Sequence, residues 1–305
     1  YIPIETKVRE LYGKILLASF ATANGFNVVI GSKKDINSNI SFFPRGIIFN
    51  FGLAKNFAKN YKRYKSYGHK VAAIDEEGLV TLKDELYIKY RVSEETLDTT
   101  DMFFCWGKKQ ASLIESEFKK NNCKIFITGN SRFDVLRPEF KSIFSDDIKK
   151  IKEKYGKIIL INTNFGYANH FSGEQSAFHS LRKKGWMNNP EDEKYFFRRM
   201  EWQKFIYNKF LELIPLLSER FRDYNIIIRP HPSENHENWK KIEENFSNVF
   251  VVHLGNVISW IMSADVLIHN GCTTAIEAYL LGTAIISYRP LIVEDVESEL
   301  PNKGL

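Results

Sequence analysis

The amino-acid sequence predicts an α/β protein built from two parallel-sheet domains that face each other across a cleft. Short β-branched runs alternate with segments of helical period along nearly the whole chain, which is typical of strands joined by crossover helices. At 305 residues the chain is about twice as long as a typical single domain, so two domains are expected. With 44% hydrophobic and 26% charged residues, the composition is that of a globular chain that can bury a core.

The first half of the chain begins with a helix and continues with strands. Residues 5–24 have helical period, because apolar side chains recur on one side of that segment. These side chains are Val8, Leu11, Ile15, Leu16 and Phe20. The strands are expected at 26–31, 46–52, 70–75, 101–107 and 124–129, and most of them end in glycine or a carboxylate. We therefore expect an N-terminal domain over residues 1–145.

A charged stretch at 145–157 marks the expected domain boundary, because few contacts should cross it. The second domain, residues 146–305, repeats the alternation and contains a long helix at 193–222. Its strands are expected at 157–163, 225–229, 248–253, 264–269 and 283–288. Residues 164–192 have no clear period, which is typical of a functional lid or a disordered segment. Because the chain ends abruptly, we expect the full protein to continue beyond residue 305.

Two basic stretches, at 55–70 and 182–209, are interleaved with aromatic residues in a chain of net charge +6. Such stretches can hold a nucleic acid or an anionic membrane surface, or they can be amphipathic helices with solvated lysines. The sequence has no zinc-ligand spacing, RNA-recognition signature or helix-turn-helix pattern, so nucleic acid is not expected as a partner. Peripheral contact between residues 55–70 and an anionic membrane is the remaining expectation.

The sequence lacks the features that would place the chain across a membrane or in an oxidising compartment. No apolar run approaches the roughly 18 residues that a membrane span needs, and no signal peptide is visible. The cysteines, Cys105, Cys123 and Cys272, lie far apart and lack metal-ligand spacing. We therefore expect a cytoplasmic protein that works at the inner face of the cytoplasmic membrane.

Three consecutive carboxylates, Asp75, Glu76 and Glu77, follow the strand expected at 70–75 and precede Gly78. Repulsion between them is expected to raise the pKa of one carboxyl toward the range of a general base. The alternative is that these residues only cap the helix that follows. The spacing alone leaves both interpretations open.

The stretch Arg229-Pro230-His231-Pro232 follows an Ile-Ile-Ile run and so lies on the loop that leaves a buried strand. Prolines on both sides of His231 fix φ and remove backbone donors, so this loop should be stiff. Arg229 and His231 can together contact a phosphate or carboxylate, the arginine through its planar fork and the histidine as a proton donor. The alternative is a histidine that only stabilises a turn.

A third motif runs from Asn270-Gly271 into a helix whose first turn contains Thr273 and Thr274. Free N–H groups at a helix N-terminus bind phosphate. Glu277 lies on the same helix face as the threonines, where a carboxylate can accept hydrogen bonds from both hydroxyls of a ribose. The alternative, which is compatible with the first interpretation, is a capping box formed by Thr274 and Glu277.

The stretch NGCTTAIEA, residues 270–278, resembles the nucleotide-binding helix of GT-B glycosyltransferases, which have two Rossmann-like domains facing across a cleft. In that family a Gly/Ser/Thr turn holds the donor phosphate and a glutamate holds the ribose. An acidic-acidic-Gly, a His-Pro and a paired Ser/Thr element also follow one another as in bacterial sialyltransferases and Kdo transferases that use CMP-activated ulosonic acids. PIETKVREL and DEEG are similar to stretches of surface carbohydrate or capsule biosynthesis proteins.

This resemblance implies a role for each motif. Glu76 or Glu77 would deprotonate the acceptor hydroxyl, although Asp75 makes the acidic run one residue too long to choose between them. His231 would bind the CMP leaving group and donate a proton to it. The donor nucleotide would contact Arg229, Ser233, Asn270, Gly271, Thr273, Thr274 and Glu277. The sequence departs from the family pattern in having Thr-Thr where Ser-Ser or Ser-Thr is usual.

The resemblance therefore implies a metal-independent glycosyltransferase that moves an ulosonic acid, of the Kdo or sialic type, from a CMP donor to a capsule or lipopolysaccharide glycan. No metal site and no cofactor besides the CMP-sugar are expected, since helix N-termini and basic side chains can neutralise the leaving phosphate. The expected acceptor is a glycan or a lipid-linked glycan. Two alternatives stay open: a UDP-sugar transferase or UDP-sugar 2-epimerase of the same fold, and a non-catalytic protein that binds a glycan or a membrane.

Overall fold

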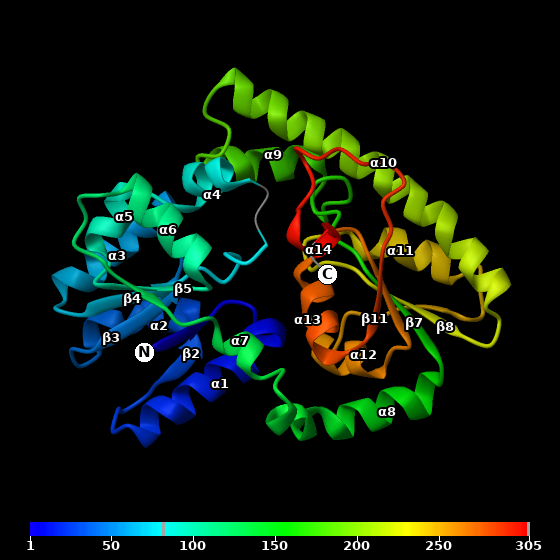
Figure 1. Ribbon diagram of the computed structural model, residues 1–305, viewed down its shortest axis with the longest axis horizontal. Helices are drawn as coiled ribbons and strands as arrows, with labels where there is room; N and C mark the ends of the chain where they lie inside the picture. Colours follow the sequence, from blue (N-terminus) through cyan, green and yellow to red (C-terminus); the bar gives the residue numbers. More distant parts are fainter. Residues whose placement is uncertain (81–82, 304–305) are drawn as a thin grey trace. The chain divides into compact units, whose positions relative to one another are not determined.

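The computed structural model describes residues 1–80 and 83–303 and divides the chain into two units. Unit 1 is Tyr1–Phe140 and unit 2 is Lys141–Leu305, and each contains a parallel sheet covered by helices, which confirms the α/β prediction (Figure 1). The division lies a few residues before the boundary predicted at 145/146. The charged stretch is not a linker, because it forms helix α8 (Ser145–Tyr155), which packs against α12 (Val257–Ser263) within unit 2.

The sheet of unit 1 is built from parallel strands whose order reverses once. The strands are β1 (Ile2–Ile4), β2 (Ile30–Ser32), β3 (Ile47–Phe51), β4 (Lys70–Ile74), β5 (Met102–Cys105) and β6 (Lys124–Ile127). β1 pairs with β2, and β3 to β6 follow one another in order. Tyr1 joins the two sets, because its N–H donates to the Ile47 carbonyl at 2.8 Å and its carbonyl accepts from the Phe49 N–H at 2.9 Å. The order is therefore β2-β1-β3-β4-β5-β6, in which the strand expected at 26–31 starts only at Ile30 and β1 was not predicted.

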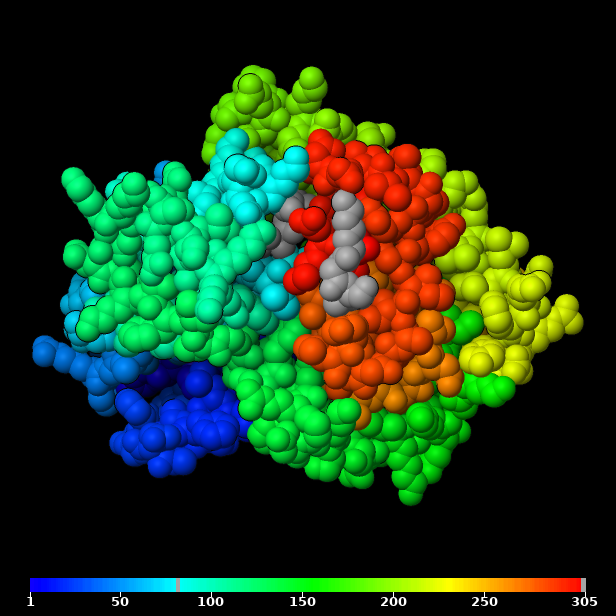
Figure 2. All heavy atoms as spheres, viewed as in Figure 1, coloured from blue at the N-terminus to red at the C-terminus, as the bar shows by residue number. Residues whose placement is uncertain are grey.

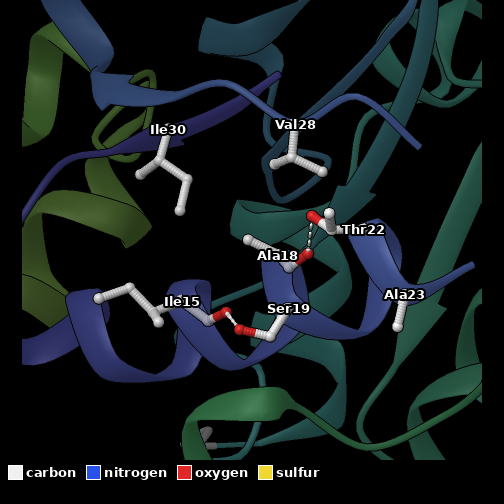
Figure 3. A pocket seen from close by; sticks show the side chains of 7 residues that line it. All are labelled: Ile15, Ala18, Ser19, Thr22, Ala23, Val28 and Ile30. Carbon is white, nitrogen blue, oxygen red and sulfur yellow. Dashed lines mark hydrogen bonds between the residues drawn. The ribbon is translucent and has the colours of Figure 1, made fainter. Parts of the chain in front are cut away.

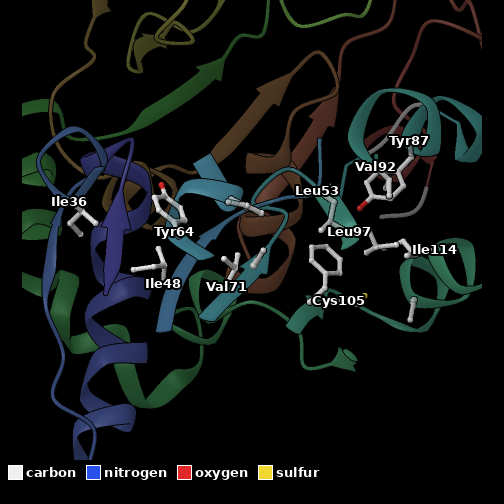
Figure 4. Close-up of a cluster of buried hydrophobic side chains, with 14 of the residues drawn as sticks. Ile36, Ile48, Leu53, Tyr64, Val71, Tyr87, Val92, Leu97, Cys105 and Ile114 are labelled. Carbon is white, nitrogen blue, oxygen red and sulfur yellow. The ribbon is translucent and has the colours of Figure 1, made fainter. Parts of the chain in front are cut away.

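Helices cover the sheet of unit 1 around an apolar core. They are α1 (Lys7–Ala23), α2 (Lys33–Asn39), α3 (Ala58–Ser66), α4 (Asp84–Arg91), α5 (Glu94–Thr99), α6 (Lys108–Glu117) and α7 (Ser131–Asp134). Short 3₁₀ turns lie at Ile40–Phe42, Lys55–Phe57 and Pro138–Phe144. The core joins side chains of the central strands to those of the helices and loops, as Figure 4 shows for Ile48, Val71, Leu97 and Ile114.

Helix α1 buries a different side from the one that its apolar period indicated. Val8, Ile15 and Phe20 are 48%, 44% and 61% exposed, and the blue residues of α1 lie on the surface of unit 1 in Figure 2. The buried positions of the helix are Glu10, Gly13, Lys14 and Ala18. A Cβ at Gly13 would lie 2.8 Å from backbone atoms of Arg132, so α1 meets α7 at a glycine, and the inward side carries the charged Glu10 and Lys14 beside the small Gly13 and Ala18.

A hollow of about 440 Å³ lies between α1 and the segment that leads into β2 (Figure 3). Its lining is mostly small or apolar and includes Ile15, Ala18 and Val28. The hydroxyls of Ser19 and Thr22 do not face a ligand there as free donors, since they donate to the carbonyls of Ile15 and Ala18 within the helix. The hollow is therefore a gap beside the helix and lacks polar groups arranged around a ligand.

The sheet of unit 2 is entirely parallel in the order β11-β10-β7-β8-β9. Its strands are β7 (Ile158–Asn162), β8 (Asn225–Arg229), β9 (Val249–Val251), β10 (Val266–His269) and β11 (Ala284–Ser287), close to the ranges predicted from the sequence. The chain builds outward from β7 to β9 and then returns to the other side of β7 with β10. The topological switch point therefore lies between β7 and β10, and ligands of open α/β sheets bind at the carboxyl ends of strands beside such a point.

The remaining helices of unit 2 are α9 (Glu174–Lys183), α10 (Pro190–Arg220), α11 (His236–Glu243), α13 (Thr273–Leu281) and α14 (Leu300–Lys303). The long helix expected at 193–222 is confirmed as α10. Residues 164–192, predicted to be an irregular lid or disordered, contain α9, so that prediction is wrong for its second half. Figure 2 shows the red segment before residue 304 beside the orange α13 on the surface of unit 2, in agreement with the packing of α13 against α14.

The packing of α10 allows a test of the core of unit 2. Phe210 is 0% exposed and its ring lies 5.3 Å from that of Phe165 and 5.2 Å from that of Tyr288. Phe210→Ala should lower the free energy of unfolding by about 3–5 kcal/mol, because it removes a buried ring and leaves a cavity. Phe205→Ala on the same helix is the control, since Phe205 is 40% exposed and its loss should cost less than about 1 kcal/mol. Urea denaturation measures both, and equal losses would contradict this account of the core.

Candidate functional site

A row of polar residues ends the strands of unit 2. Arg229, Asn162, His269 and Ser287 are the last residues of β8, β7, β10 and β11, and they lie beside one another in register. The row before it consists of Ile228, Ile161, Ile268 and Ile286. Because residues in register on parallel strands point to the same face, the four polar side chains share one face at the carboxyl edge of the sheet.

The two outer members of the row are held by neighbouring segments. The Arg229 guanidinium donates to the carbonyls of Leu254 and Gly255 at 2.8 and 3.1 Å and lies 5.2 Å from the centre of the Trp260 ring. Burial lowers the pKa of Arg229 to about 10, so it stays charged at neutral pH. The Ser287 hydroxyl donates to Asn302 at 2.7 Å. Arg229 therefore anchors the loop after β9, and the phosphate contact predicted for it together with His231 stays a prediction.

The two inner members, Asn162 and His269, are 3% and 0% exposed. Within the part of the chain that the structure describes, the amide oxygen and nitrogen of Asn162 have no hydrogen-bond partner. The Nε2 of His269 has none there either. The Nδ1 of His269 accepts the Gly271 N–H at 3.0 Å, which assigns the ring proton to Nε2. Burial lowers the pKa of His269 to about 4, so the ring is neutral at neutral pH. Buried groups without partners are uncommon, and these two flank the switch point.

Helix α13 begins next to this pair. Gly271 has φ +92° and a Cβ there would lie 3.0 Å from the Nδ2 of Asn302, so the turn into the helix requires glycine. Cys272 is the N-cap and no side chain caps the helix, so the capping box proposed for Thr274 and Glu277 is not formed. Thr273 and Thr274 are half-buried in the first turn, and Glu277 is 1% exposed. The N-cap residue of α13 therefore makes no capping hydrogen bond through a side-chain oxygen, while the Thr274 hydroxyl lies 2.7 Å from the Cys272 sulfur.

The His231 loop is arranged by side chains as well as by its prolines. His231 is exposed, and its Nδ1 accepts the Ser233 N–H at 3.2 Å and lies 2.7 Å from the Ser233 hydroxyl. Ser233 also touches the loop after β7, because a Cβ at Gly166 would lie 2.6 Å from its hydroxyl oxygen. Ser233 thus orients His231 and fits against Gly166, while the nucleotide contact predicted for it remains a prediction.

Glu234, which sequence reasoning missed, joins the loops after β7 and β8. Its carboxylate is 2% exposed and accepts hydrogen bonds from both loops and from α11. The donors are the Thr163 hydroxyl (2.7 Å), the N–H groups of Phe165 (3.0 Å) and His231 (3.1 Å), the Trp239 indole (2.9 Å) and the Asn169 amide (3.4 Å). The sequence did place a glutamate three residues after His231, on the loop that follows a buried strand. That position alone does not reveal the role of Glu234, because most of its hydrogen-bond donors are remote in sequence.

The predicted nucleotide loops are separated by a third loop. Because β7 lies between β8 and β10, the loop after β7 lies between the His231 loop and the start of α13. The Asn164 carbonyl accepts the Asn270 amide at 3.4 Å and the Gln203 amide at 3.1 Å. Asn270 is thereby tied to the loop after β7 and to α10. The carboxyl edge of unit 2 is one connected arrangement of loops around Asn162 and His269.

In unit 1, each residue of the acidic run has its own cation. Asp75 pairs with Arg91, whose Nε donates to Oδ2 at 3.1 Å. Glu76 pairs with Lys14 of α1. Glu77 pairs with Arg9, also of α1. Because the cations come from the two helices α1 and α4, they hold the turn after β4 in place.

The repulsion expected within the acidic run is therefore absent at Glu76. Burial by itself would raise the pKa of Glu76, but the charge of Lys14 and the hydrogen bonds from Lys14 and Asn130 outweigh it, so the pKa is lowered. The expectation of a raised pKa is wrong for this residue. Asp75 and Glu76 are 2% and 6% exposed, whereas the Glu77 side chain is 41% exposed. Of the three carboxylates, Glu77 is the one that a substrate can reach.

The basic stretch at 55–70 is less suited to a membrane than its sequence indicated. Tyr61 and Tyr64 are fully buried, and Tyr67 is 44% exposed. Lys62 is paired with Glu95, and Lys65 and Lys70 with Asp101. Tyr61 and Tyr64 are therefore not available to a membrane surface, and the peripheral contact expected for residues 55–70 stays a prediction. Among the described helices, none is both long and apolar enough to cross a membrane.

Comparison with known proteins supports the fold. No protein-family model and no curated protein matches the chain. A UDP-GlcNAc 2-epimerase structure from Methanocaldococcus jannaschii matches 99% of this chain and 85% of its own, with a TM-score of 0.53 and 13% identity. A putative UDP-N-acetylglucosamine 2-epimerase from Listeria monocytogenes matches 95% and 79%, with a TM-score of 0.52 and 14% identity.

A second structure of the Methanocaldococcus jannaschii enzyme, in complex with UDP-GlcNAc and UDP, matches 84% of this chain and 64% of its own, with a TM-score of 0.51 and 13% identity. Together with the two parallel-sheet units, these likenesses define an α/β protein of GT-B-like fold with two Rossmann-like domains, as predicted. At such low identity they show the fold alone. The resemblance to sialyltransferases and Kdo transferases stays a prediction.

Lys14 provides a test of the buried charge pair in unit 1. Lys14→Met should lower the free energy of unfolding by about 3–5 kcal/mol at neutral pH, because it leaves Glu76 buried without its cation. The folded-state pKa of Glu76 lies below its ordinary value of 4.5, so its ionised form stabilises the fold above that value and this stability is lost as the pH falls through the folded pKa. Urea denaturation should therefore show the difference between wild type and variant shrinking in acid.

Arg9→Met is the matched control for that measurement. Its partner Glu77 is half-exposed, so the loss should be within about 1 kcal/mol. Equal losses for the two variants, or a pH-independent loss for Lys14→Met, would show that the buried pair is not what holds the turn.

Glu234 can be tested with its amide analogue. Both carboxylate oxygens of Glu234 face N–H or O–H donors, so a glutamine there must turn its NH₂ toward a donor. Glu234→Gln should therefore lower the free energy of unfolding by about 2–4 kcal/mol, despite the nearly equal shape. Glu237→Gln is the control, since that side chain is exposed and pairs with Lys240 at the surface. If the two variants unfold at the same urea concentration, Glu234 does not carry the connection between the loops.

Proposed function

We propose that the protein is an enzyme that acts on a UDP-sugar, and that unit 2 holds the nucleotide at its carboxyl edge beside the switch point. The observation that carries this proposal is the buried pair Asn162 and His269: in the described chain, the amide of Asn162 and the Nε2 of His269 lack partners, and both lie next to the start of α13. The pair offers a ligand three N–H donors, two from the Asn162 amide and one from the Nε2 of His269, and one carbonyl acceptor. A nucleotide sugar is rich in the complementary groups.

The phosphates would lie over the first turn of α13. Backbone N–H groups and the positive end of the helix dipole favour a negative charge there, and Gly271 lets the backbone approach it. In this proposal Asn270, Thr273 and Thr274 contact the phosphates, and Glu277 accepts hydrogen bonds from the ribose hydroxyls. The loop after β7, which links Asn270 to α10, would close the site from the other side.

The reaction that this site suits is cleavage of the bond between the anomeric carbon and the phosphate oxygen. The bond breaks with its electron pair leaving on UDP, whose negative charge the start of α13 would stabilise. In an epimerase the anomeric carbon would gain a double bond to C2 as the C2 proton is removed, and in a transferase it would gain a bond to the acceptor oxygen as the hydroxyl proton is removed. A UDP-sugar 2-epimerase and a UDP-sugar transferase both break this bond. The named activity of the compared structures supports the epimerase, and one of them is a complex with UDP-GlcNAc and UDP.

Transfer of an ulosonic acid from a CMP donor to a surface glycan is a second candidate. It is favoured by the exposure of Glu77, which pairs with Arg9 but is the carboxylate of the run that a substrate can reach, and by the exposed His231 on its ordered loop. A glycan or lipid-linked glycan acceptor and contact with an anionic membrane belong to this candidate.

Ligand-induced stabilisation of wild type and of Asn162→Leu tests the nucleotide site. At 100 times its Kd, a bound nucleotide adds about 2.7 kcal/mol, which should raise the melting temperature by several degrees. We expect UDP and UDP-GlcNAc to stabilise wild type more than CMP does. Asn162→Leu should lose that stabilisation, yet without ligand it should be as stable as wild type or more so, because an apolar side chain replaces an unpaired amide.

Asn225→Leu provides the control at the opposite end of the sheet. Its amide donates to the Tyr155 carbonyl at 2.6 Å, so this variant should be less stable without ligand and should keep the response to UDP. A wild type that is not stabilised by any of the nucleotides would overturn the proposal. With UDP-GlcNAc, inversion at C2 would identify the epimerase, and UDP release that depends on a glycan acceptor would identify a transferase.

A further inference from the structure

Helix α10 carries a polar stripe beside the loop after β7. Tyr195, Arg199 and Gln203 are spaced four residues apart, so they lie on one side of the helix. Gln203 fixes where this side points, since its amide donates to the Asn164 carbonyl at 3.1 Å and accepts the Tyr167 N–H at 3.1 Å. The Arg199 guanidinium lies 5.2 Å from the centre of the Tyr167 ring. Figure 1 shows α10 running along unit 2.

This stripe adjoins the proposed nucleotide site through a shared carbonyl. The Asn164 oxygen accepts from Gln203 of α10 and from Asn270, which precedes α13. Arg199 is one helical turn, or about 6 Å, from Gln203. The Arg199 guanidinium therefore lies at the edge of the loops that surround the switch point.

Two donors of this stripe, one each on Tyr195 and Arg199, lack acceptors in the described chain. Among residues 1–80 and 83–303, the Nε of Arg199 and the hydroxyl of Tyr195 are buried without a hydrogen-bond partner. The neighbouring Arg198 pairs with Asp295. Burial raises the pKa of Tyr195 although the charge of Arg199 acts in the opposite direction, so the phenol keeps its proton at neutral pH. A half-buried cation and a buried hydroxyl that each carry such a donor fit an anionic oxygen group.

We propose that Arg199 and Tyr195 bind an anionic oxygen group of the donor substrate, either the terminal phosphate of a nucleoside diphosphate or the carboxylate of an ulosonic acid. The planar fork of arginine matches both groups, and the Tyr195 hydroxyl supplies a further donor. This inference rests on the proposed function and adds to it a subsite outside the start of α13. The subsite recognises the part of the donor that differs between UDP-sugars and CMP-ulosonic acids.

Binding measurements with Arg199→Gln and Arg198→Gln test the subsite. Calorimetry on the full chain would compare UDP with UMP, and CMP-N-acetylneuraminate with CMP. If the subsite takes a phosphate, Arg199→Gln should weaken UDP by about 10- to 100-fold and UMP far less, because one charge-assisted hydrogen bond is lost. If it takes a carboxylate, the same loss should fall on CMP-N-acetylneuraminate and spare CMP. Arg198→Gln, which removes the same charge one residue away, should change each affinity less than about 2-fold.

Two further variants keep the test independent of folding. Arg199→Lys retains the charge without the fork and should recover part of the affinity, and Tyr195→Phe should weaken the same ligand by a smaller factor. Equal affinities for Arg199→Gln and wild type, in a wild type that binds UDP or the CMP-sugar, would overturn the subsite alone. A wild type that binds none of the four ligands would overturn the proposed function and the subsite with it.

Discussion

A polar group that is removed from water must find a hydrogen-bond partner, and this constraint shapes the carboxyl ends of both parallel sheets. In unit 1 it is met internally, because Asp75, Glu76 and Glu77 each pair with a cation from a neighbouring helix. In unit 2, Glu234 meets it for the loops after β7 and β8 by accepting several donors at once. Asn162 alone among these residues has both of its polar atoms without a partner in the described chain.

The sequence predicted the strands well and the contacts at their ends poorly. A run such as Ile226–Ile228 is a local signal, because a strand buried on both faces needs consecutive apolar residues. The cations that neutralise the acidic run could not be found in this way, since Lys14 lies 62 residues before Glu76. The side of α1 that is buried could not be predicted from the sequence either. It is decided by the close approach of Gly13 to the backbone of Arg132 and not by the apolar period of the helix.

The same limit applies to the candidate site. Two of its loops were predicted from motifs, because a buried strand that ends in Arg-Pro-His-Pro or Asn-Gly can be recognised from its local sequence. The loop after β7 was not, and it lies between them only because the strand order places β7 between β8 and β10. Likeness of fold at 13–14% identity does not supply the missing residues, since one fold hosts many activities. The proposed function therefore rests on the polar groups at the carboxyl edge of the unit 2 sheet.

The polar groups at the carboxyl edge of unit 2 differ in whether the protein itself supplies their hydrogen-bond partners. Arg229 and Ser287, at the sides of the polar row, have partners in neighbouring segments and so have a structural reason to be polar. Asn162 and the Nε2 of His269, in the middle of the same row, have none in the described chain, and apolar residues would fill their places at less cost. Leu160 and Leu267, two positions earlier and on the same face, show that this sheet accepts such residues. Polar side chains without partners, at the switch point and beside the start of α13, therefore fit the proposed binding site better than a core.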